Sequence, residues 1–304
     1  GTKDETSVGR LPYLTLGLPD LRDGNGECLW YAVSGSFKNN PKPDILNWDS
    51  TGRFRILDET SAPLALPGDQ LGLAAAVIFA PGAPLPEQSR SPGDGRCGGD
   101  LPASAIQHYL EAIRTRSGKG VIDVTTAITA ESNDRIAWIT GGDIYRQLKA
   151  NGAFARHIQQ VIAATAGCLA HLPPPSGIET TGATQLGRIP ALADNTGPCN
   201  SATLRDATGN WTEVMRYVRC SDGSACLAGN SGSCRGAVLF GGERLPGSQR
   251  RLEGADKLAT GQYLEPATQA AIAAHQIASL RSTFAIPFAA RQQVASTDIA
   301  VCIP

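Results

Sequence analysis

The sequence predicts an α+β fold in which two diverged copies of one unit each combine an antiparallel sheet with helix packing. Short segments that match one another occur in both halves of the chain in the same order. Apolar runs of strand length lie between Gly- and Pro-rich stretches, and one long stretch, 143–170, carries apolar residues at helical spacing. We therefore predict two domains, 1–142 and 143–304, joined through this helix.

The repeat is visible as five pairs of matching segments. Each short match carries little weight alone, but five in the same order are hard to obtain by chance. If the copies are real, the paired segments should occupy equivalent positions in space. The pairs are 9–12 with 187–190, 24–33 with 209–218, 75–90 with 236–250, 109–111 with 263–265, and 132–139 with 296–303, the last with one gap.

Strands are predicted where Val, Ile, Phe, Trp and Tyr are enriched between turn-forming residues. A strong turn signal, Asp23-Gly24-Asn25-Gly26, precedes the first strand. Two Pro- and Gly-rich stretches are expected to be irregular, 81–102 as a loop and 173–187 as a linker. The predicted strands are 28–33, 54–57, 74–79 and 136–139 in the first half, and 214–218, 236–240 and 299–303 in the second.

Three helices are predicted from their apolar spacing, over 103–116, 143–170 and 266–282. Thr140 or Asp143 can cap the second helix, and Asn151-Gly152 can break it. This helix leads into the second copy of the Gly-Arg-x-Pro segment, so we also expect a helix before the first copy. That helix would lie upstream of Gly1, and we expect that native residues before Gly1 have been removed.

Composition excludes some classes of partner. The 304 residues carry a net charge of −1 with no long basic run, so nothing favours binding to nucleic acid or to an anionic membrane surface. The longest apolar run, 71–80, is too short to span a membrane and is typical of a buried strand.

Eight cysteines and four histidines favour disulfides over a zinc site. No two cysteines form the C-x-x-C pair that is common in zinc sites. Disulfides would place the protein in an oxidising, extracytoplasmic compartment, and the alternative is buried thiols in a cytosolic protein. The spacing leaves the pairing open, because eight cysteines allow about a hundred connectivities. The disulfide candidates are Cys28, Cys97, Cys168, Cys199, Cys220, Cys226, Cys234 and Cys302.

The segment 9–37, GRLPYLTLGLPDLRDGNGECLWYAVSGSF, resembles the part of pilin-like proteins with a prepilin leader that follows their N-terminal helix. In that family a D-x-W-G turn leads into an aromatic strand. Asp23 and Gly26 match the turn and Tyr31 matches the strand, whereas Asn25 stands where a Trp is usual. The stretches APGAPLPEQSR, YLE and NDRIAWIT are also similar to parts of bacterial proteins of this class. The resemblance covers about half of the chain.

The resemblance implies two pilin-like units and a function outside the cytoplasm. Proteins of this family insert into the inner membrane through an N-terminal helix. They assemble with other pilin or pseudopilin subunits into a type IV pilus or a type II secretion pseudopilus. The chain would then be a minor structural subunit and not an enzyme, anchored in the inner membrane and periplasmic, or on the cell surface.

Two other hypotheses come from different functional classes. The second is a periplasmic or surface module for ligand binding or adhesion that uses the cleft between the repeats, because binding sites favour such interfaces. The third is a periplasmic hydrolase, which would need titratable residues that converge on one site.

The hydrolase hypothesis depends on residues that have a simpler explanation. Ser231 in a G-N-S-G-S loop and His275 in an A-A-H segment echo serine proteases, but a Ser/Gly-rich loop between cysteines explains the first. Asp123, Glu131 and Asp134 could pair as glycosidase carboxylates, but turns at strand ends explain them as well. No catalytic residue is therefore predicted.

Metal binding has weak support in the sequence. The segment 23–27 offers oxygen ligands at alternate positions, as calcium prefers, but it lacks the sixth-position Gly and the bidentate Glu of a complete loop. The four histidines have no ligand spacing. We predict no cofactor, with calcium as the alternative.

A Leu-Pro-x-x-x-Arg pattern occurs in both halves and ends at Arg90 and Arg250. Two guanidinium groups at equivalent loops could bind a ligand or a partner through its carboxylate or phosphate groups. The alternative is a structural salt bridge from each Arg to the Glu of the Tyr-Leu-Glu segment in the same half, Glu111 or Glu265.

Overall fold

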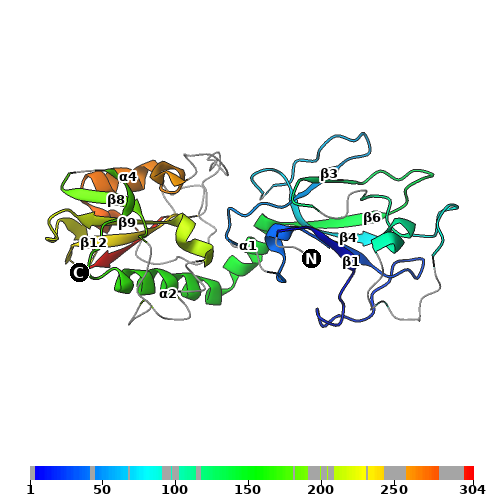
Figure 1. The fold of residues 1–304 in the computed structure, drawn as a ribbon, viewed down its shortest axis with the longest axis horizontal. Coiled ribbons are helices and arrows are strands. Elements are labelled where there is room, and N and C mark those ends of the chain that lie inside the picture. Colours follow the sequence, from blue (N-terminus) through cyan, green and yellow to red (C-terminus); the bar gives the residue numbers. More distant parts are fainter. Residues whose placement is uncertain are drawn as a thin grey trace. The chain divides into compact units, whose positions relative to one another are not determined.

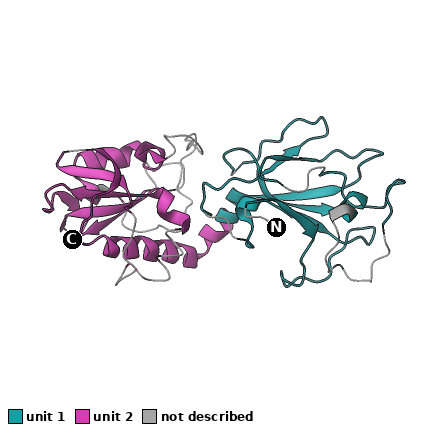
Figure 2. Cartoon of the chain, in the orientation of Figure 1, with its two compact units in different colours: residues 1–145 teal, residues 146–304 magenta. Residues whose placement is uncertain are grey.

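The protein forms two compact units, residues 1–145 and 146–304, shown in teal and magenta in Figure 2. The sequence had predicted a division after residue 142. Both units combine helices with sheets that are mainly antiparallel. The computed structural model describes residues 4–41, 45–67, 69–90, 97, 103–113, 118–180, 182–190, 199, 204, 209–230, 232–242, 258–280 and 298–304.

Unit 1 is built on a six-stranded sheet of order β1-β2-β4-β3-β5, in which β6 also pairs with β4. All pairs are antiparallel except β3 with β5. The central strand β4 reads AAAVIFA, and its small and β-branched residues suit a strand with neighbours on both edges. The strands are β1 (Ser7–Arg10), β2 (Trp30–Val33), β3 (Phe54–Leu57), β4 (Ala74–Ala80), β5 (Ile122–Thr125) and β6 (Arg135–Thr140).

One face of this sheet carries the core of unit 1. Trp30, Phe79 and Val77 on this face pack against residues that follow the 3-10 helix η2 (Ala103–His108). The rings of Trp30 and Tyr109 lie 5.1 Å apart in a tilted arrangement. Aromatic burial of this kind contributes strongly to a small core.

The helix predicted over 103–116 is wrong in type and length. Within 103–113 the structure has η2, and Ile113 makes a β-bridge with Val124, whereas 114–116 lie outside the described residues. The main-chain N–H groups of Glu111 and Ala112 donate to the carboxylate of Asp134, at 2.8 Å each. These N–H groups are therefore not available for the i→i−4 bonds that would continue a helix.

The predicted long helix is present as two helices, α1 (Gly141–Ala150) and α2 (Gly152–Cys168), and the predicted break at Asn151 is confirmed. Thr140 caps α1: its N–H donates to the Asp143 carboxylate at 2.9 Å, and the Asp143 N–H donates to the Thr140 hydroxyl at 3.2 Å. Asn151 caps α2 by accepting from the Ala153 N–H at 2.9 Å. Reciprocal caps of this kind satisfy the free N–H groups of a first turn.

Unit 2 contains a five-stranded sheet of order β13-β12-β9-β8-β7, which is antiparallel throughout. A short hairpin of β10 (Leu227–Gly229) and β11 (Gly232–Cys234) lies apart from it. The strands of the sheet are β7 (Ser176–Thr180), β8 (Thr184–Arg188), β9 (Met215–Cys220), β12 (Gly236–Phe240) and β13 (Ile299–Ile303).

The sheet of unit 2 is covered on both faces. Helix α2 packs on β12 and β13, whereas α4 (Pro266–Ala273) lies on the opposite side, so that the unit has three layers (Figure 1). Ile272 of α4 and Ile277 of the 3-10 helix η7 (Ile277–Ser279) join the core on the α4 side. Buried apolar residues therefore face the sheet from two directions, which explains why every residue of β12 is buried.

Two predictions for the second half are wrong. The expected linker 173–187 instead contains most of the β7–β8 hairpin. Its two short strands pair with each other, and β8 also pairs with β9. The expected helix 266–282 ends at Ala273, and His275 has a positive φ of 60°, which a continuing helix does not allow. The part of this prediction beyond residue 280 lies outside the described residues.

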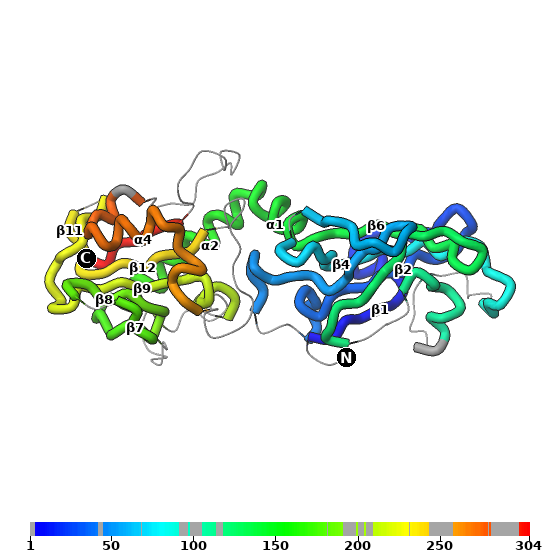
Figure 3. Tube along the Cα trace, turned by 90° about the horizontal axis from the view of Figure 1, so that it is seen from above, coloured from blue at the N-terminus to red at the C-terminus, as the bar shows by residue number. Residues whose placement is uncertain are grey.

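The two sheets share one pattern of strand pairing. In unit 1, β1, β2, β4 and β6 pair in that order, and in unit 2 β8, β9, β12 and β13 do the same, with every pair antiparallel. Figure 3 labels these four strands of unit 1. Matching rows of paired residues cross the two sheets: Gly9, Tyr31, Ile78 and Ala137 in unit 1, and Gly187, Tyr217, Val238 and Val301 in unit 2.

These rows correct the sequence match by one residue. The sequence match pairs Phe79 with Phe240. Phe79, however, packs in the core of unit 1 with Tyr109, whereas the ring of Phe240 lies 5.7 Å from that of Trp211. A shift of one residue moves a side chain to the other face of a sheet. When the strands are matched by these rows, 132–139 and 296–303 align without a gap, and Asp134 corresponds to Asp298.

The prediction of disulfides is confirmed for all eight cysteines. Each bridge lies within one unit and ties distant segments in three of the four cases. Four disulfides indicate an oxidising, extracytoplasmic environment. Within the described part of the chain, every helix is too short or too polar to cross a membrane. The bridges are Cys28–Cys97, Cys168–Cys199, Cys220–Cys226 and Cys234–Cys302.

Candidate functional site

A groove of about 920 Å³ in unit 1 is lined in part by titratable residues. The edge strand β5 supplies Asp123 and Thr125 to its wall, and the bend after Thr129 supplies Glu131. Glu111, which follows η2, completes an acidic lining. Two of the three carboxylates considered from the sequence, Asp123 and Glu131, thus line one groove, and the third, Asp134, lies beside Glu111.

Asp123 is engaged in a cross-strand ion pair. The parallel register of β3 and β5 places Arg55 opposite Asp123, and the guanidinium forms two bonds with the carboxylate, at 2.7 and 3.0 Å. Both side chains are about half exposed, at 45% and 49%, so water screens the pair and its contribution to stability is small. The bidentate geometry nevertheless fixes the direction of the carboxylate.

Asp134 is a buried carboxyl group with a raised pKa. It is 1% exposed, and burial together with the neighbouring Glu111 raises the pKa of Asp134 to about 7. One of its oxygens accepts the two N–H bonds from Glu111 and Ala112. Among the described residues, its other oxygen has no hydrogen-bond partner.

Glu111 forms a pair with Asp134. Burial also raises the pKa of Glu111, and hydrogen bonds from the Asn133 N–H and from Gln88, together with the charge of Arg90, oppose this rise. The negative charge of Glu111 in turn helps to raise the pKa of Asp134. Glu111 thus brings a carboxylate to the wall of the groove, whereas Asp134 is buried.

Arg90 is buried beside this pair and its N–H groups are used within unit 1. The guanidinium stacks on Tyr109 at 5.2 Å and donates to the carbonyls of Gly82 and His108, both at 2.8 Å. Its ion-pair partner is Glu27, at 3.3 Å, rather than Glu111 as the sequence suggested. With only 4% of its side chain exposed, Arg90 has the surroundings of a structural residue.

Arg250, its proposed counterpart, lies outside the described residues. The structure therefore does not test whether Arg90 and Arg250 bind a ligand as a pair. Arg90 by itself offers little exposed surface to a ligand.

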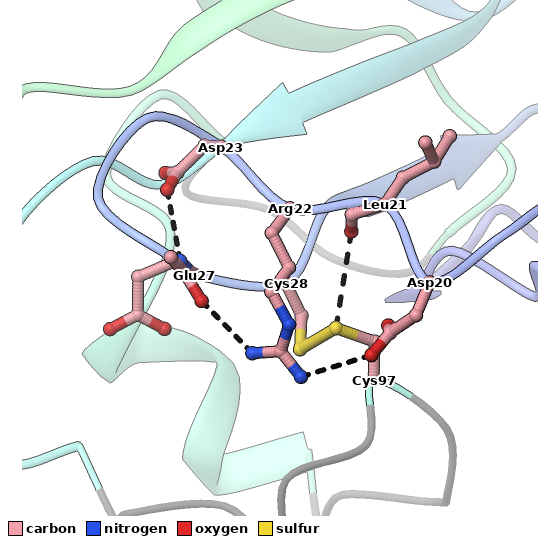
Figure 4. The surroundings of a disulfide bond; sticks show 8 residues. Asp20, Leu21, Arg22, Asp23, Glu27, Cys28 and Cys97 are labelled. Carbon is pink, nitrogen blue, oxygen red and sulfur yellow. Dashed lines mark hydrogen bonds and ion pairs between the residues drawn. A yellow bond between two sulfur atoms is a disulfide. The ribbon is translucent and has the colours of Figure 1, made fainter.

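The turn at 23–27 is organised by Asp23, as Figure 4 shows for part of its surroundings. The carboxylate of Asp23 accepts from the N–H groups of Asn25, Glu27 and Gly82, at 2.9, 2.9 and 2.7 Å. Both of its oxygens thus bind main-chain N–H groups rather than pointing to a common centre. Among the described residues, no group of three His, Cys, Asp or Glu is arranged to hold a metal ion.

The disulfide Cys28–Cys97 lies next to this turn (Figure 4). Arg22 bridges the turn by bonding the Asp20 carboxylate at 3.1 Å and the Gly26 carbonyl at 2.9 Å. The turn, the disulfide and Arg90 together hold the loop that leads into β2.

Unit 2 repeats the link between the buried Asp and the Tyr-Leu-Glu segment. Asp298 is 1% exposed and accepts from the Glu265 N–H at 3.0 Å and from the Gly242 N–H at 2.8 Å. A guanidinium again covers the tyrosine of this segment, because Arg216 lies 4.2 Å from the ring of Tyr263. Arg216 comes from β9, however, so the positive charge reaches the ring from a different position.

The serine-protease comparison concerned Ser231 and His275, and the structure describes one main-chain contact between their segments. The Ala228 N–H donates to the His275 carbonyl at 2.8 Å, so the A-A-H segment does lie next to the β10–β11 hairpin. Ser231 at the tip of that hairpin lies outside the described residues. His275, with its positive φ, lies in the turn after α4.

Sequence reasoning missed the pairing of Glu111 with Asp134. A signal for it was present, because a Tyr-Leu-Glu segment and an Asp before the last strand occur in both halves. Comparison of the chain with protein-family models, with curated proteins and with solved structures gives no match.

Proposed function

We propose that the protein is a non-enzymatic, extracytoplasmic structural subunit, a minor pilin or pseudopilin of a type IV pilus or a type II secretion-like assembly. Its partners would be other pilin or pseudopilin subunits. The observation that carries the proposal is the architecture of unit 2, in which a helix precedes an antiparallel sheet and packs along its last two strands. The family that the sequence resembles is built in this order.

The packing of α2 suits such a subunit. Its buried residues recur at helical spacing along one side and face β12 and β13. Stability in such a unit comes from burying this side against the sheet rather than from the helix alone. The buried positions include Ala155, Ile158, Val161, Ile162 and Thr165.

The shared strand order of the two sheets supports an origin of the chain as two copies of one pilin-like unit. The correspondence extends from the strand pairs to the buried bond between Asp134 and Glu111, which unit 2 repeats with Asp298 and Glu265. A tandem subunit is larger than a repeating subunit of a close-packed shaft would be. Its size favours a tip or another low-copy position.

The disulfides support a location outside the cytoplasm, where a secreted surface protein folds. Cys234–Cys302 ties the last strand to β11, so the C-terminal end of unit 2 is closed covalently. A subunit that is exposed to proteases and shear benefits from such a constraint.

Cell fractionation tests the proposal. Bacteria that produce the full-length protein are sheared, and the fibre, inner-membrane and periplasmic fractions are probed with an antibody against unit 2. We expect the protein in the fibre or membrane fraction, and its loss from the fibres when the prepilin-processing peptidase is deleted. A protein found only free in the periplasm, unaffected by that deletion, would contradict the proposal.

The groove in unit 1 favours ligand binding as a second candidate function. Its carboxylates, Glu111, Asp123 and Glu131, suit a cationic or polyhydroxylated ligand. Calorimetric titration with spermidine and with neutral oligosaccharides tests this candidate. Glu131→Gln should weaken binding of the cation, whereas Glu59→Gln, an exposed change outside the groove lining, should not. Absence of heat with all probes would remove this candidate.

A further inference from the structure

The sheet of unit 1 has a second face that carries apolar side chains without being buried. Strand β4 alternates between buried and half-buried residues, and β6 alternates between exposed and half-buried ones. The outward residues come together through the strand register, which pairs Ile78 with both Tyr31 and Ala137. We name this surface the open face and define it by Tyr31, Val33, Ala76, Ile78, Ala137 and Ile139.

The open face is apolar enough to require an explanation. Ala137 is exposed, and Ile139 is 43% exposed. The other four residues of the face are half-buried. They lie opposite the core residues Trp30, Val77 and Phe79, which point to the other side of the same strands. Contiguous apolar surface of this kind on a sheet commonly marks a site where another element docks.

Unit 2 shows what covers the corresponding face. The row that contains Tyr31, Ile78 and Ala137 in unit 1 contains Tyr217, Val238 and Val301 in unit 2. There Tyr217 and Val238 are 0% exposed. A Cβ added to Gly236 on this face would lie 3.1 Å from Leu172, which follows α2, and 3.5 Å from Tyr217. The face that is open in unit 1 is thus the α2 face in unit 2.

The position of α2 in the chain identifies the occupant. Helix α2 comes before β8, with β7 between them, and β8 corresponds to β1. In unit 1, β1 forms the outer edge of the sheet, with β2 as its neighbour. A helix that occupied the open face in the same way would therefore stand on the N-terminal side of β1.

We infer that the open face of unit 1 is the seat of an α-helix joined to the N-terminal side of β1, with an apolar side like that of α2. The inference rests on the proposed function in that both need a helix before β1, but it adds the surface on which that helix lies. The helix should carry apolar residues at helical spacing along one side, as α2 does with Ala155, Ile158, Val161 and Ile162.

Side-chain labelling by hydroxyl radicals tests the inference on the full-length gene product and on the chain 1–304. We expect labelling of Tyr31 and Ile139 to fall severalfold in the longer protein. Leu14, which is 76% exposed and lies outside the open face, is the internal control and should label equally in both. Equal labelling of Tyr31 in the two proteins, or upstream residues without an apolar-sided helix, would overturn the inference.

A substitution supplies a second readout. Ala137→Lys places a charge on the open face at an exposed position, so it should leave the melting temperature of 1–304 nearly unchanged and lower that of the longer protein by several degrees. Leu14→Lys is the matched control and should lower neither. An equally small change in melting temperature in both proteins on Ala137→Lys would contradict a helix on the open face.

The outcomes separate this inference from the proposed function. Protection of Tyr31 in a protein that is absent from fibres and membranes would keep the seat and reject the pilin assignment. A protein that is present in fibres, with Tyr31 labelled as in 1–304, would keep the assignment and reject the seat.

Discussion

The main-chain N–H of Glu111 donates a 2.8 Å hydrogen bond to the buried carboxylate of Asp134, and unit 2 repeats this bond at 3.0 Å between Glu265 and Asp298. Each Asp stands immediately before the last strand of its four-strand pattern, Asp134 before β6 and Asp298 before β13. The bond therefore joins the Tyr-Leu-Glu segment to the end of the sheet in both units. It also ends η2 in unit 1, because the acidic side chain takes the N–H groups that a longer helix would use.

Removal of the buried Asp should destabilise its unit. Asp134→Ala leaves two N–H groups without their acceptor, and we expect the free energy of unfolding of unit 1 to fall by about 2–4 kcal/mol. Asp298→Ala should have a similar effect on unit 2. Urea denaturation followed by fluorescence measures both. A loss below about 0.5 kcal/mol for either variant would show that water replaces the carboxylate.

The stability of unit 1 should depend on pH through Asp134. Its pKa is about 7 in the folded protein and 3.8 for the free side chain, so the folded state binds more protons between these values. The free energy of unfolding should therefore fall as pH rises from about 4 to about 7. The raised pKa of Glu111 acts in the same direction, and Arg90 opposes both rises.

Asp134→Asn isolates this effect. The amide oxygen can still accept from Glu111 and Ala112, but the side chain no longer titrates. Urea midpoints of unit 1 measured between pH 5 and pH 8 should be flatter with pH in this variant than in the native protein. An unchanged slope would assign the pH dependence to other groups.

Arg90 should be a stability residue rather than a binding residue. Arg90→Lys cannot reproduce the planar stacking on Tyr109 together with the bonds to the Gly82 and His108 carbonyls, and we expect a loss of about 2–4 kcal/mol. Arg55→Lys, in an exposed pair, should cost less than about 1 kcal/mol. Thermal unfolding of the two variants compares them, and equal losses would contradict the structural role.

The disulfides should differ in what they contribute. Cys234–Cys302 spans 68 residues of sequence and Cys220–Cys226 spans 6. Loop entropy predicts stabilisation of about 4 kcal/mol for the first and about 2 kcal/mol for the second. Paired Cys→Ser variants measured in urea should follow this order, and a larger loss from the shorter loop would show that native-state packing, not loop closure, dominates.

Much of the local structure follows from the sequence. Strands β3, β12 and β13 form where the apolar runs predict them. Thr140 and Asp143 cap the first helix as predicted, and the break falls at Asn151 as predicted. These features depend on residues that are close in the chain, so their physical causes are visible in a short window. The oxidised state of the cysteines likewise follows from their number and spacing.

The candidate site was only partly predictable. Asp123, Glu131 and Asp134 were singled out as carboxylates, but their surroundings were not: one pairs with Arg55, one lines the groove and one is buried beside Glu111. A pKa near 7 for Asp134 requires burial and a neighbour 23 residues away in the chain. A pattern of neighbouring residues does not reveal a contact between residues so far apart in the chain.

The sequence by itself determined that the chain has strands in a repeated order, a capped helix pair before the second set, and cysteines suited to disulfides. The tertiary structure alone decided which cysteines pair, that 173–187 is a hairpin, and that the two sheets correspond with a shift of one residue. The reason is physical: period, capping and turn chemistry act between neighbours in the chain. Register and the direction in which side chains point depend on which distant segment lies across a sheet. Phe79 and Phe240, which match in the sequence, therefore point to opposite faces.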